Sequence, residues 1–202
     1  ILCAYSHTFI AKSINKKLEK FLPVSRVVKN SDGTFALSYD FPDSIGYIAP
    51  FYGNFALLLR AYGYILMLGK QGLIDTTNHA VLNANYIKER LKKYFKLAYD
   101  RICMHESVFS ASQQADRGVH AIDIAKYLID QGIHPPTVYF PLIVPEAIMI
   151  EPTESESKPV MDLFIDIMIE ADRLTRESPE SFKEFPKTMP ITRPDEVKAA
   201  RD

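Results

Sequence analysis

Two apolar runs that almost touch in the sequence place the strongest constraint on the fold of this chain. They are Thr137–Val144 ("TVYFPLIV") and Ala147–Ile150 ("AIMI"), and only Pro145 and Glu146 separate them. A parallel pair of strands needs a crossover of a dozen or more residues, so two strands joined this closely must be antiparallel. A mainly antiparallel sheet is therefore expected.

The segments around this pair predict three helices and one more strand. Apolar residues recur at helical spacing over three ranges, 77–95, 119–131 and 159–175. Strand-type residues predict a strand over 101–110. In the first helix, Lys88, Lys92 and Lys93 are expected on the solvated face. The order α-β-α-β-β-α predicts the α+β class, with helices backing the sheet.

Upstream of these elements, the sequence predicts a hairpin and a strongly apolar helix. Residues 24–39 ("VSRVVKNSDGTFALSY") have strand-type runs on both sides of a turn. Residues 54–68 form the helix, with Asn54 as its cap and Gly69 as its stop. We expect this helix to be buried, and Gly63 within it to allow another backbone to approach closely.

These patterns divide the chain into three regions. Residues 1–75 hold the hairpin and the apolar helix, residues 76–177 form the α+β domain, and residues 178–202 have four prolines and little periodicity. We expect the last region to be an extended arm that ends in a short helix.

Composition excludes several classes of function. The chain has 202 residues and a formal net charge of −1, which argues against a nucleic-acid or anionic-membrane binder. Cys3 and Cys103 have neither metal-ligand spacing nor a disulfide framework, so a reducing cytoplasm is expected. The five histidines are scattered, and no metal site is expected.

An acidic turn, "EPTESES", follows the second apolar run and starts the third helix. Ser155 or Ser157 can cap that helix, and the acidic side chains favour the positive end of its dipole. Glu151 ends an apolar strand, so we expect it to be partly buried and to need a partner. The turn can be structural, part of a site, or both.

Other polar groups stand at the ends of elements, where ligands often meet a scaffold. Tyr52, Gly53 and Asn54 form a helix entry that could bind an anion, although physical reasoning alone favours an ordinary helix start. His105 and Glu106 lie on opposite faces of their strand by alternation. His134 follows the glycine that ends the second helix.

The same stretches resemble a known family. "GIHPPTVYFPLIVPEAIMIEPTESESK" is similar to the C-terminal part of glycine dehydrogenase (decarboxylating), the P-protein of the glycine cleavage system, and most similar to its subunit 2 form. "FYGNFALLLRAYGYI", "NHAVLNANYIKERL", "CMHESVFSA" and "PITRPDEVKAARD" support the resemblance.

The resemblance implies the small C-terminal domain of the aspartate-aminotransferase-like fold and a pyridoxal-phosphate cofactor. It implies that the complete enzyme decarboxylates glycine and transfers the aminomethyl group to the lipoyl arm of the H-protein. Subunit 1 of the P-protein is the other implied partner, and an oligomer is expected. The residues expected near substrate or cofactor are Tyr52, Gly53, Asn54, His105, His134, Thr137 and Glu151.

The start of the chain departs from the family pattern. The family has a His-Lys-Thr-Phe segment with the cofactor lysine and then a glycine-rich loop, whereas this chain begins "ILCAYSHTFIAKSINKK". We therefore expect a C-terminal fragment that neither holds the cofactor nor decarboxylates glycine by itself. Two alternatives remain open: a non-catalytic module that docks subunit 1 or the carrier protein, and the small domain of another pyridoxal-phosphate enzyme of this fold.

Overall fold

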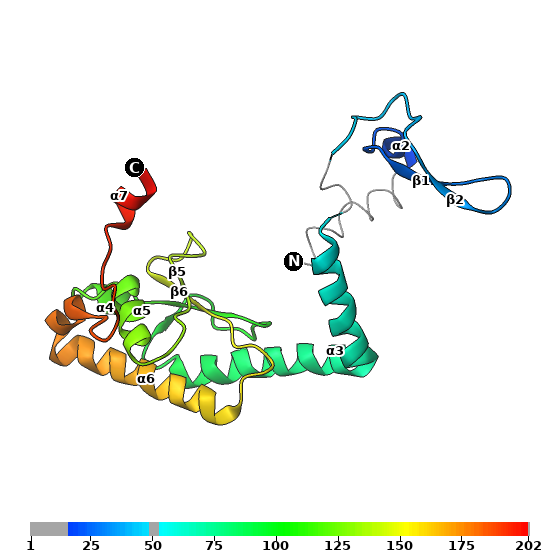
Figure 1. Cartoon of the computed structure of the whole chain (residues 1–202). Helices are drawn as coiled ribbons and strands as arrows, with labels where there is room; N and C mark the ends of the chain where they lie inside the picture. Colours follow the sequence, from blue (N-terminus) through cyan, green and yellow to red (C-terminus); the bar gives the residue numbers. More distant parts are fainter. Residues whose placement is uncertain (1–15, 49–52, 202) are drawn as a thin grey trace. The chain divides into compact units, whose positions relative to one another are not determined.

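The computed structural model describes residues 16–48 and 53–201, which form two compact units divided after Lys70 (Figure 1). Within the described ranges, no helix is both long and apolar enough to cross a membrane.

The predicted hairpin forms in the first unit. Strand β1 (Arg26–Lys29) pairs antiparallel with β2 (Phe35–Ser38), so that Arg26 lies opposite Ser38. At the turn, the amide of Thr34 donates to the side chain of Asp32, and Gly33 has a φ of 86°. Arg26 donates to the carbonyl of Glu19 at 2.6 Å, which fastens the short helix α2 (Lys16–Glu19) to the hairpin.

Helix α3 (Phe55–Leu91) begins as predicted and is divided by Gly69, whose φ of 62° and ψ of −171° are not helical. Asn54 caps it by accepting from the amide of Ala56 at 2.9 Å. The expectation of a buried helix is wrong for this chain, because Phe55 is 77% exposed and Met67 is 81% exposed. Among the described residues, a Cβ on Gly63 would meet no atom within 4 Å, so this part of the chain does not make the close backbone approach that was expected there.

The second unit contains one four-stranded antiparallel sheet, as predicted. Its strands are ordered β3 (Lys96–Leu97), β4 (Ser107–Ser110), β6 (Ala147–Ile150) and β5 (Thr137–Val138). Two predicted strands are much shorter than expected. The range 101–110 is a strand only from Ser107, and the run from Thr137 leaves the sheet at Tyr139, where φ is 59°.

Helices cover this sheet and supply most of its core. The second part of α3 passes beside α6 (Lys158–Glu177), and Tyr86 on α3 hydrogen-bonds Asp162 on α6 (Figure 1). Helix α5 (Ala121–Asp130) ends as predicted at Gly132, whose φ is 74°. A short helix, α4 (Ser112–Ala115), precedes it. The fully buried core includes Leu91, Phe109, Ile124, Leu128, Ile148, Ile165 and Met168.

Lys88 was expected on the solvated face of α3, and that expectation is wrong. Its side chain is 5% exposed, and its ammonium group donates to the carbonyl of Arg101 at 2.8 Å. The non-helical segment after Leu97 folds over this face of α3, and Asn85 holds it by donating to the carbonyl of Cys103 at 2.8 Å. A polar residue within the helix is thus covered by a loop.

The segment expected as an extended arm differs from that expectation over its first part. It starts with the 3₁₀ helix η1 (Pro179–Glu184), whose Phe182 is fully buried and packs against Tyr127 with ring centroids 5.7 Å apart. Arg193 donates to the carbonyl of Phe182 at 2.7 Å, so the chain stays attached beyond η1. A short terminal helix, α7 (Glu196–Arg201), follows as predicted.

Candidate functional site

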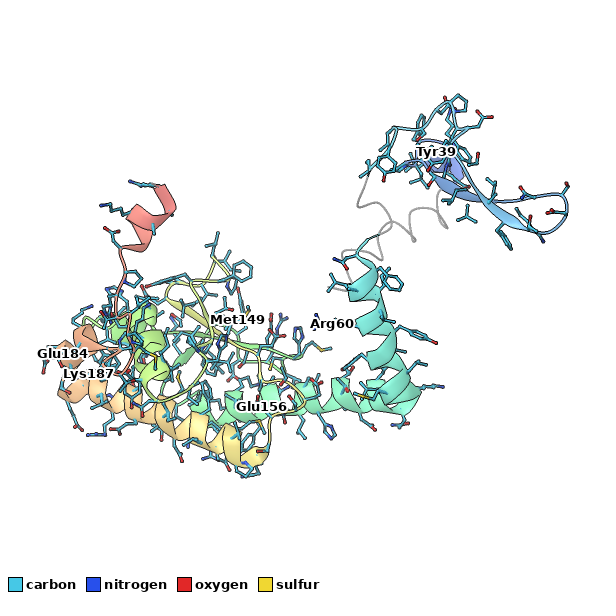
Figure 2. The ribbon with its side chains drawn as sticks, viewed as in Figure 1. Tyr39, Arg60, Met149, Glu156, Glu184 and Lys187 are labelled. Atoms are coloured by element: carbon cyan, nitrogen blue, oxygen red, sulfur yellow. The ribbon has the colours of Figure 1, made fainter. Side chains whose placement is uncertain are left out.

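A cavity of about 490 Å³ opens where strands β5 and β6 meet the start of helix α6. We call it the strand-end pocket. Its lining includes the buried apolar side chains of Ile87, Ile150 and Met161. Met149 and Glu156, labelled in Figure 2, also line it. The pocket therefore joins an apolar floor to a polar rim, the combination typical of small-molecule sites.

Three of the predicted site residues lie at this pocket. His134, Thr137 and Glu151 all line it. Thr137 is the first residue of β5 and pairs with Met149 on β6, while Glu151 directly follows β6. Antiparallel pairing puts the beginning of one strand beside the end of the other, so residues 14 apart in sequence are brought to the same place.

Glu151 does not have the environment that the sequence predicted. Its side chain is 57% exposed, so the expectation of partial burial is wrong. The strand ends at Ile150, and Glu151 turns toward solvent at the rim of the pocket. Its neighbour is His105, whose Nε2 lies 3.8 Å from the Glu151 carboxylate. His105 itself lines a different cavity, so the two histidines of the predicted set do not line the same pocket.

The acidic turn after Glu151 is fixed from α3. Asn83, which is 7% exposed, donates to the carbonyl of Thr153 at 2.9 Å. Ser157, one of the two predicted cap residues, is the N-cap of α6, and Pro159 stands in the first turn of the helix. The cap has no side-chain hydrogen bond, so the serine acts through its extended backbone alone. The turn is thus both a helix start and one wall of the pocket.

Gly53 and Asn54 belong to the first unit, and Tyr52 lies outside the described residues. Gly53 has a φ of 80°, a conformation that favours glycine. The Asn54 side chain accepts from the amides of Ala56 and Leu57 at 2.9 and 3.4 Å. Those two amides are therefore satisfied by the cap, which is the ordinary function of asparagine at a helix start.

Sequence reasoning missed Asn83 and also Glu146. Glu146 has a φ of 50°, and its carboxylate accepts from the amide of Ala121 at 2.7 Å, at the start of α5. The same carboxylate lies 3.1 Å from His120 Nδ1. It therefore fastens the β5–β6 connection to the positive end of a helix. Nothing in the local pattern around Pro145 predicts a partner 25 residues away.

The pocket supplies hydrogen-bonding groups but no covalent anchor for a carbonyl cofactor. Among the described residues that line it there is no lysine. Throughout the described ranges, no group of three or more histidine, cysteine, aspartate or glutamate side chains could hold a metal ion. The arrangement suits binding and orientation of a polar molecule against apolar walls.

Comparison with solved structures defines the fold class. The chain matches a structure described as "Crystal structure of glycine decarboxylase (P-protein) of the glycine cleavage system, in inhibitor-bound form", with a TM-score of 0.61 and 14% identity. The match covers 77% of this chain and 37% of that chain. The shared fold is therefore that of a part of a P-protein, an α+β part with an antiparallel sheet backed by helices.

A family model then gives the particular family. The model described as "Glycine dehydrogenase, C-terminal domain" matches residues 76–184, more than half of the chain. The chain belongs to this family, which confirms the resemblance seen in the sequence.

Curated relatives are much longer than this chain. "Probable glycine dehydrogenase (decarboxylating) subunit 2" of Treponema denticola is 54% identical over 188 residues, covering 93% of this chain and 39% of the relative. The protein of the same name from Caldanaerobacter subterraneus subsp. tengcongensis is 50% identical over 189 residues, covering 94% of this chain and 39% of the relative. The chain thus spans about 39% of the length of these relatives.

Proposed function

We propose that this chain is the C-terminal part of subunit 2 of a pyridoxal-phosphate-dependent glycine dehydrogenase (decarboxylating). The observation that supports the proposal best is the 54% identity over 188 residues to a relative of that name. The family match over residues 76–184 supports the same assignment for the second unit. In the complete enzyme, glycine would lose CO₂ and its aminomethyl group would pass to the lipoyl arm of the H-protein.

The described residues do not fit a covalent cofactor site on their own. Pyridoxal phosphate, when bound, acts as an electron sink for the carbanion left by decarboxylation. Its anchoring requires a lysine in the site, and none lines the strand-end pocket among the described residues. We therefore assign the covalent anchor to the remaining length of the enzyme.

The proposed task of the strand-end pocket is to bind and orient polar groups at the edge of the active-site cleft. His134 and Thr137 can donate hydrogen bonds to an anionic group, and Glu151 can accept one from an amine or amide. The apolar floor of Ile87, Ile150 and Met161 limits the water around such a group. No proton transfer is assigned to these residues.

Variants of the complete enzyme, assayed with subunit 1 and lipoylated H-protein, test this role. His134→Ala and Glu151→Gln should each lower the rate of CO₂ release from glycine by about tenfold or more, because a hydrogen bond to a charged group is lost. Unfolding temperatures should remain unchanged, since Glu151 is 57% exposed. The matched control is His79→Ala, which removes an exposed histidine of α3 outside the pocket.

Unchanged rates in both variants would contradict a functional role for the pocket while leaving the family assignment intact.

Asn54→Ala is a separate case, because the cap contributes to folding. We expect it to lower the free energy of unfolding by about 1 kcal/mol. A loss of activity at a temperature where this variant is fully folded would support a site role for Asn54 as well.

The proposal includes partners and a compartment. Relatives are named as subunit 2, which implies a partner subunit, and we propose subunit 1 of the P-protein and the H-protein as the partners of the complete enzyme. An oligomer follows from the exposed apolar surface of the chain. The cytoplasm is proposed as the compartment, because Cys103 is a free thiol.

A second candidate function is a non-catalytic assembly module. The loop after β5 favours it, because Leu142 is 87% exposed and Ile143 is 76% exposed, as in a docking surface. Reading the gene sequence that precedes Ile14 separates the two candidates. A cofactor-lysine segment and a glycine-rich loop in frame would support the enzyme, and their absence would favour the module.

A further inference from the structure

A second cavity, of about 570 Å³, lies beside the strand-end pocket in the same unit. We call it the Lys88 pocket. It is lined by Lys88 of α3, by Leu97 and Tyr99, and by residues 101–108. None of the residues predicted from the family resemblance lines it except His105, and the proposed function does not use it.

The Lys88 pocket contains two buried polar groups that the fold does not fully use. The Lys88 side chain is 5% exposed, and its ammonium donates to the carbonyl of Arg101 at 2.8 Å and lies 3.2 Å from Glu89. An ammonium has three donors, so a third is available for a ligand. Ser107 is 2% exposed, and its hydroxyl has no hydrogen-bond partner among residues 16–48 and 53–201.

An unsatisfied buried hydroxyl is uncommon in proteins and calls for an explanation. Serine and alanine occupy similar space, so packing alone does not require the hydroxyl of Ser107. A ligand atom in the pocket would satisfy it and would also meet the buried ammonium group. Both groups can donate to an oxygen atom.

The charges around the pocket restrict the ligand further. Arg101 adds a second positive charge, but Glu106 also lines the cavity and Glu89 stands beside Lys88. These carboxylates would repel a dianion such as phosphate, whereas the charge of a monoanion can be balanced by the one ammonium group of Lys88. Apolar side chains of Leu97, Ile102 and Met104 line the remainder and suit a short carbon chain.

We propose that the Lys88 pocket binds the carboxylate of a small organic acid, with the Lys88 ammonium and the Ser107 hydroxyl as donors. The inference goes beyond the proposed function and does not depend on it, because it concerns binding rather than decarboxylation.

Cys103 lines the same pocket and provides a probe. Burial raises the pKa of its thiol above the ordinary value, while the positive charge of Lys88 opposes this rise. Iodoacetate and iodoacetamide attack the same thiolate, and only iodoacetate has a carboxylate. The fraction of Cys103 present as thiolate affects both rate constants equally and cancels in their ratio. The ratio therefore reports how strongly the pocket attracts a carboxylate.

The experiment uses the full-length enzyme, with alkylation of Cys103 followed by peptide mass spectrometry. Relative to the urea-unfolded protein, the iodoacetate-to-iodoacetamide ratio should rise by about tenfold through the local field. Ser107→Ala should weaken this rise without loss of stability, because one of the two donors is lost and the hydroxyl has no partner among the described residues. Lys88→Met should abolish it, whereas Lys92→Met, just beyond the end of α3 at Leu91, should retain it.

Butyrate should protect Cys103 from iodoacetate, and inorganic phosphate at the same concentration should protect it much less. Equal protection by phosphate would overturn the carboxylate assignment. A ratio equal to that of the unfolded protein would overturn the site itself. Failure of both reagents to reach Cys103 in the folded enzyme would show that other parts of the protein fill the pocket, which also overturns a small-molecule ligand. If Lys88→Met does not fold, the effect of Ser107→Ala on the ratio of the two alkylation rate constants tests the proposal.

Discussion

Asp123 is the buried carboxylate that attaches the C-terminal segment to the second unit. Its side chain is 2% exposed, and it accepts from Lys183 at 3.0 Å and from Arg193 at 2.8 Å. The amide of His120 donates to it as well, at 3.0 Å. Burial alone would raise the pKa of Asp123, but these donors lower it below the ordinary value.

The lowered pKa predicts how this attachment depends on pH. A carboxyl with a depressed pKa stabilises the fold above its unfolded value, near 3.8, and the contribution is lost as the pH falls through the folded pKa. Asp123→Asn should therefore lower the free energy of unfolding by about 1–3 kcal/mol at neutral pH. The difference from wild type should shrink below about pH 4.

Chemical denaturation between pH 3 and 7 provides the measurement. Asp166→Asn is the matched control, because Asp166 is exposed on α6, and it should change stability by less than about 0.5 kcal/mol. A constant difference between wild type and Asp123→Asn down to pH 3 would refute this account of the pKa.

Single-residue environments were the least predictable part of the site. His134, Thr137 and Glu151 were expected near a site because they stand at the ends of predicted elements. The exposure of Glu151 and the burial of Lys88 could not be predicted from the sequence, because both depend on where a neighbouring loop runs. Helical periodicity assigns a lysine to the solvated side and contains no information about a carbonyl, such as that of Arg101, contributed 13 residues later.

At the scale of elements, Gly69 is the position where α3 is divided. Its φ of 62° with ψ of −171° lies in a region that is essentially restricted to glycine. A Cβ there would meet no atom within 4 Å, so the constraint is in the backbone rather than in packing. Gly63, in the first part of the same helix, has equally open surroundings but no positive φ.

These two glycines predict opposite effects of the same substitution. Gly69→Ala should lower the free energy of unfolding by about 1–3 kcal/mol, because alanine is strained at that φ and ψ. Gly63→Ala should raise it by up to about 1 kcal/mol through higher helix propensity. Thermal unfolding monitored by circular dichroism measures both. Equal shifts in the two variants would show that the backbone at Gly69 is not constrained.

Long, strongly periodic elements could be predicted from the sequence, and short ones could not. Helix α6 and the hairpin of β1 and β2 form where the pattern indicated. Strand β3 has two residues, too few to show an alternation. The 3₁₀ helix η1 was missed because its central core residue, Phe182, stands among prolines and charged residues that are typical of a loop.

At the scale of the whole chain, the first part of α3 presents an apolar stripe. Phe55, Leu59, Tyr62 and Leu66 are each more than half exposed and recur at helical spacing. A stripe of this kind marks an interaction surface. Since the chain spans about 39% of its relatives' length, the remaining length of such a protein is available to cover it.

The stripe predicts that the chain by itself associates into oligomers. Light scattering after size exclusion should give a mass above that of one chain, and Leu59→Glu with Leu66→Glu should reduce it to one chain. Leu163→Glu is the control, at an exposed leucine of α6 in the other unit. A monomeric wild-type chain at high concentration would contradict the prediction.

The strand order β3-β4-β6-β5 also has a kinetic consequence. The two four-residue strands occupy the centre of the sheet, and the two-residue strands flank them at the edges. An edge strand of two residues can detach while the centre stays paired, so its amide protons exchange with solvent through local opening. The amides shared by Phe109 and Ile148 lie between fully buried side chains and should exchange only when the whole unit unfolds. Thr137 stands on one of the detachable strands, so one wall of the strand-end pocket can open and close without disturbing the core beneath it.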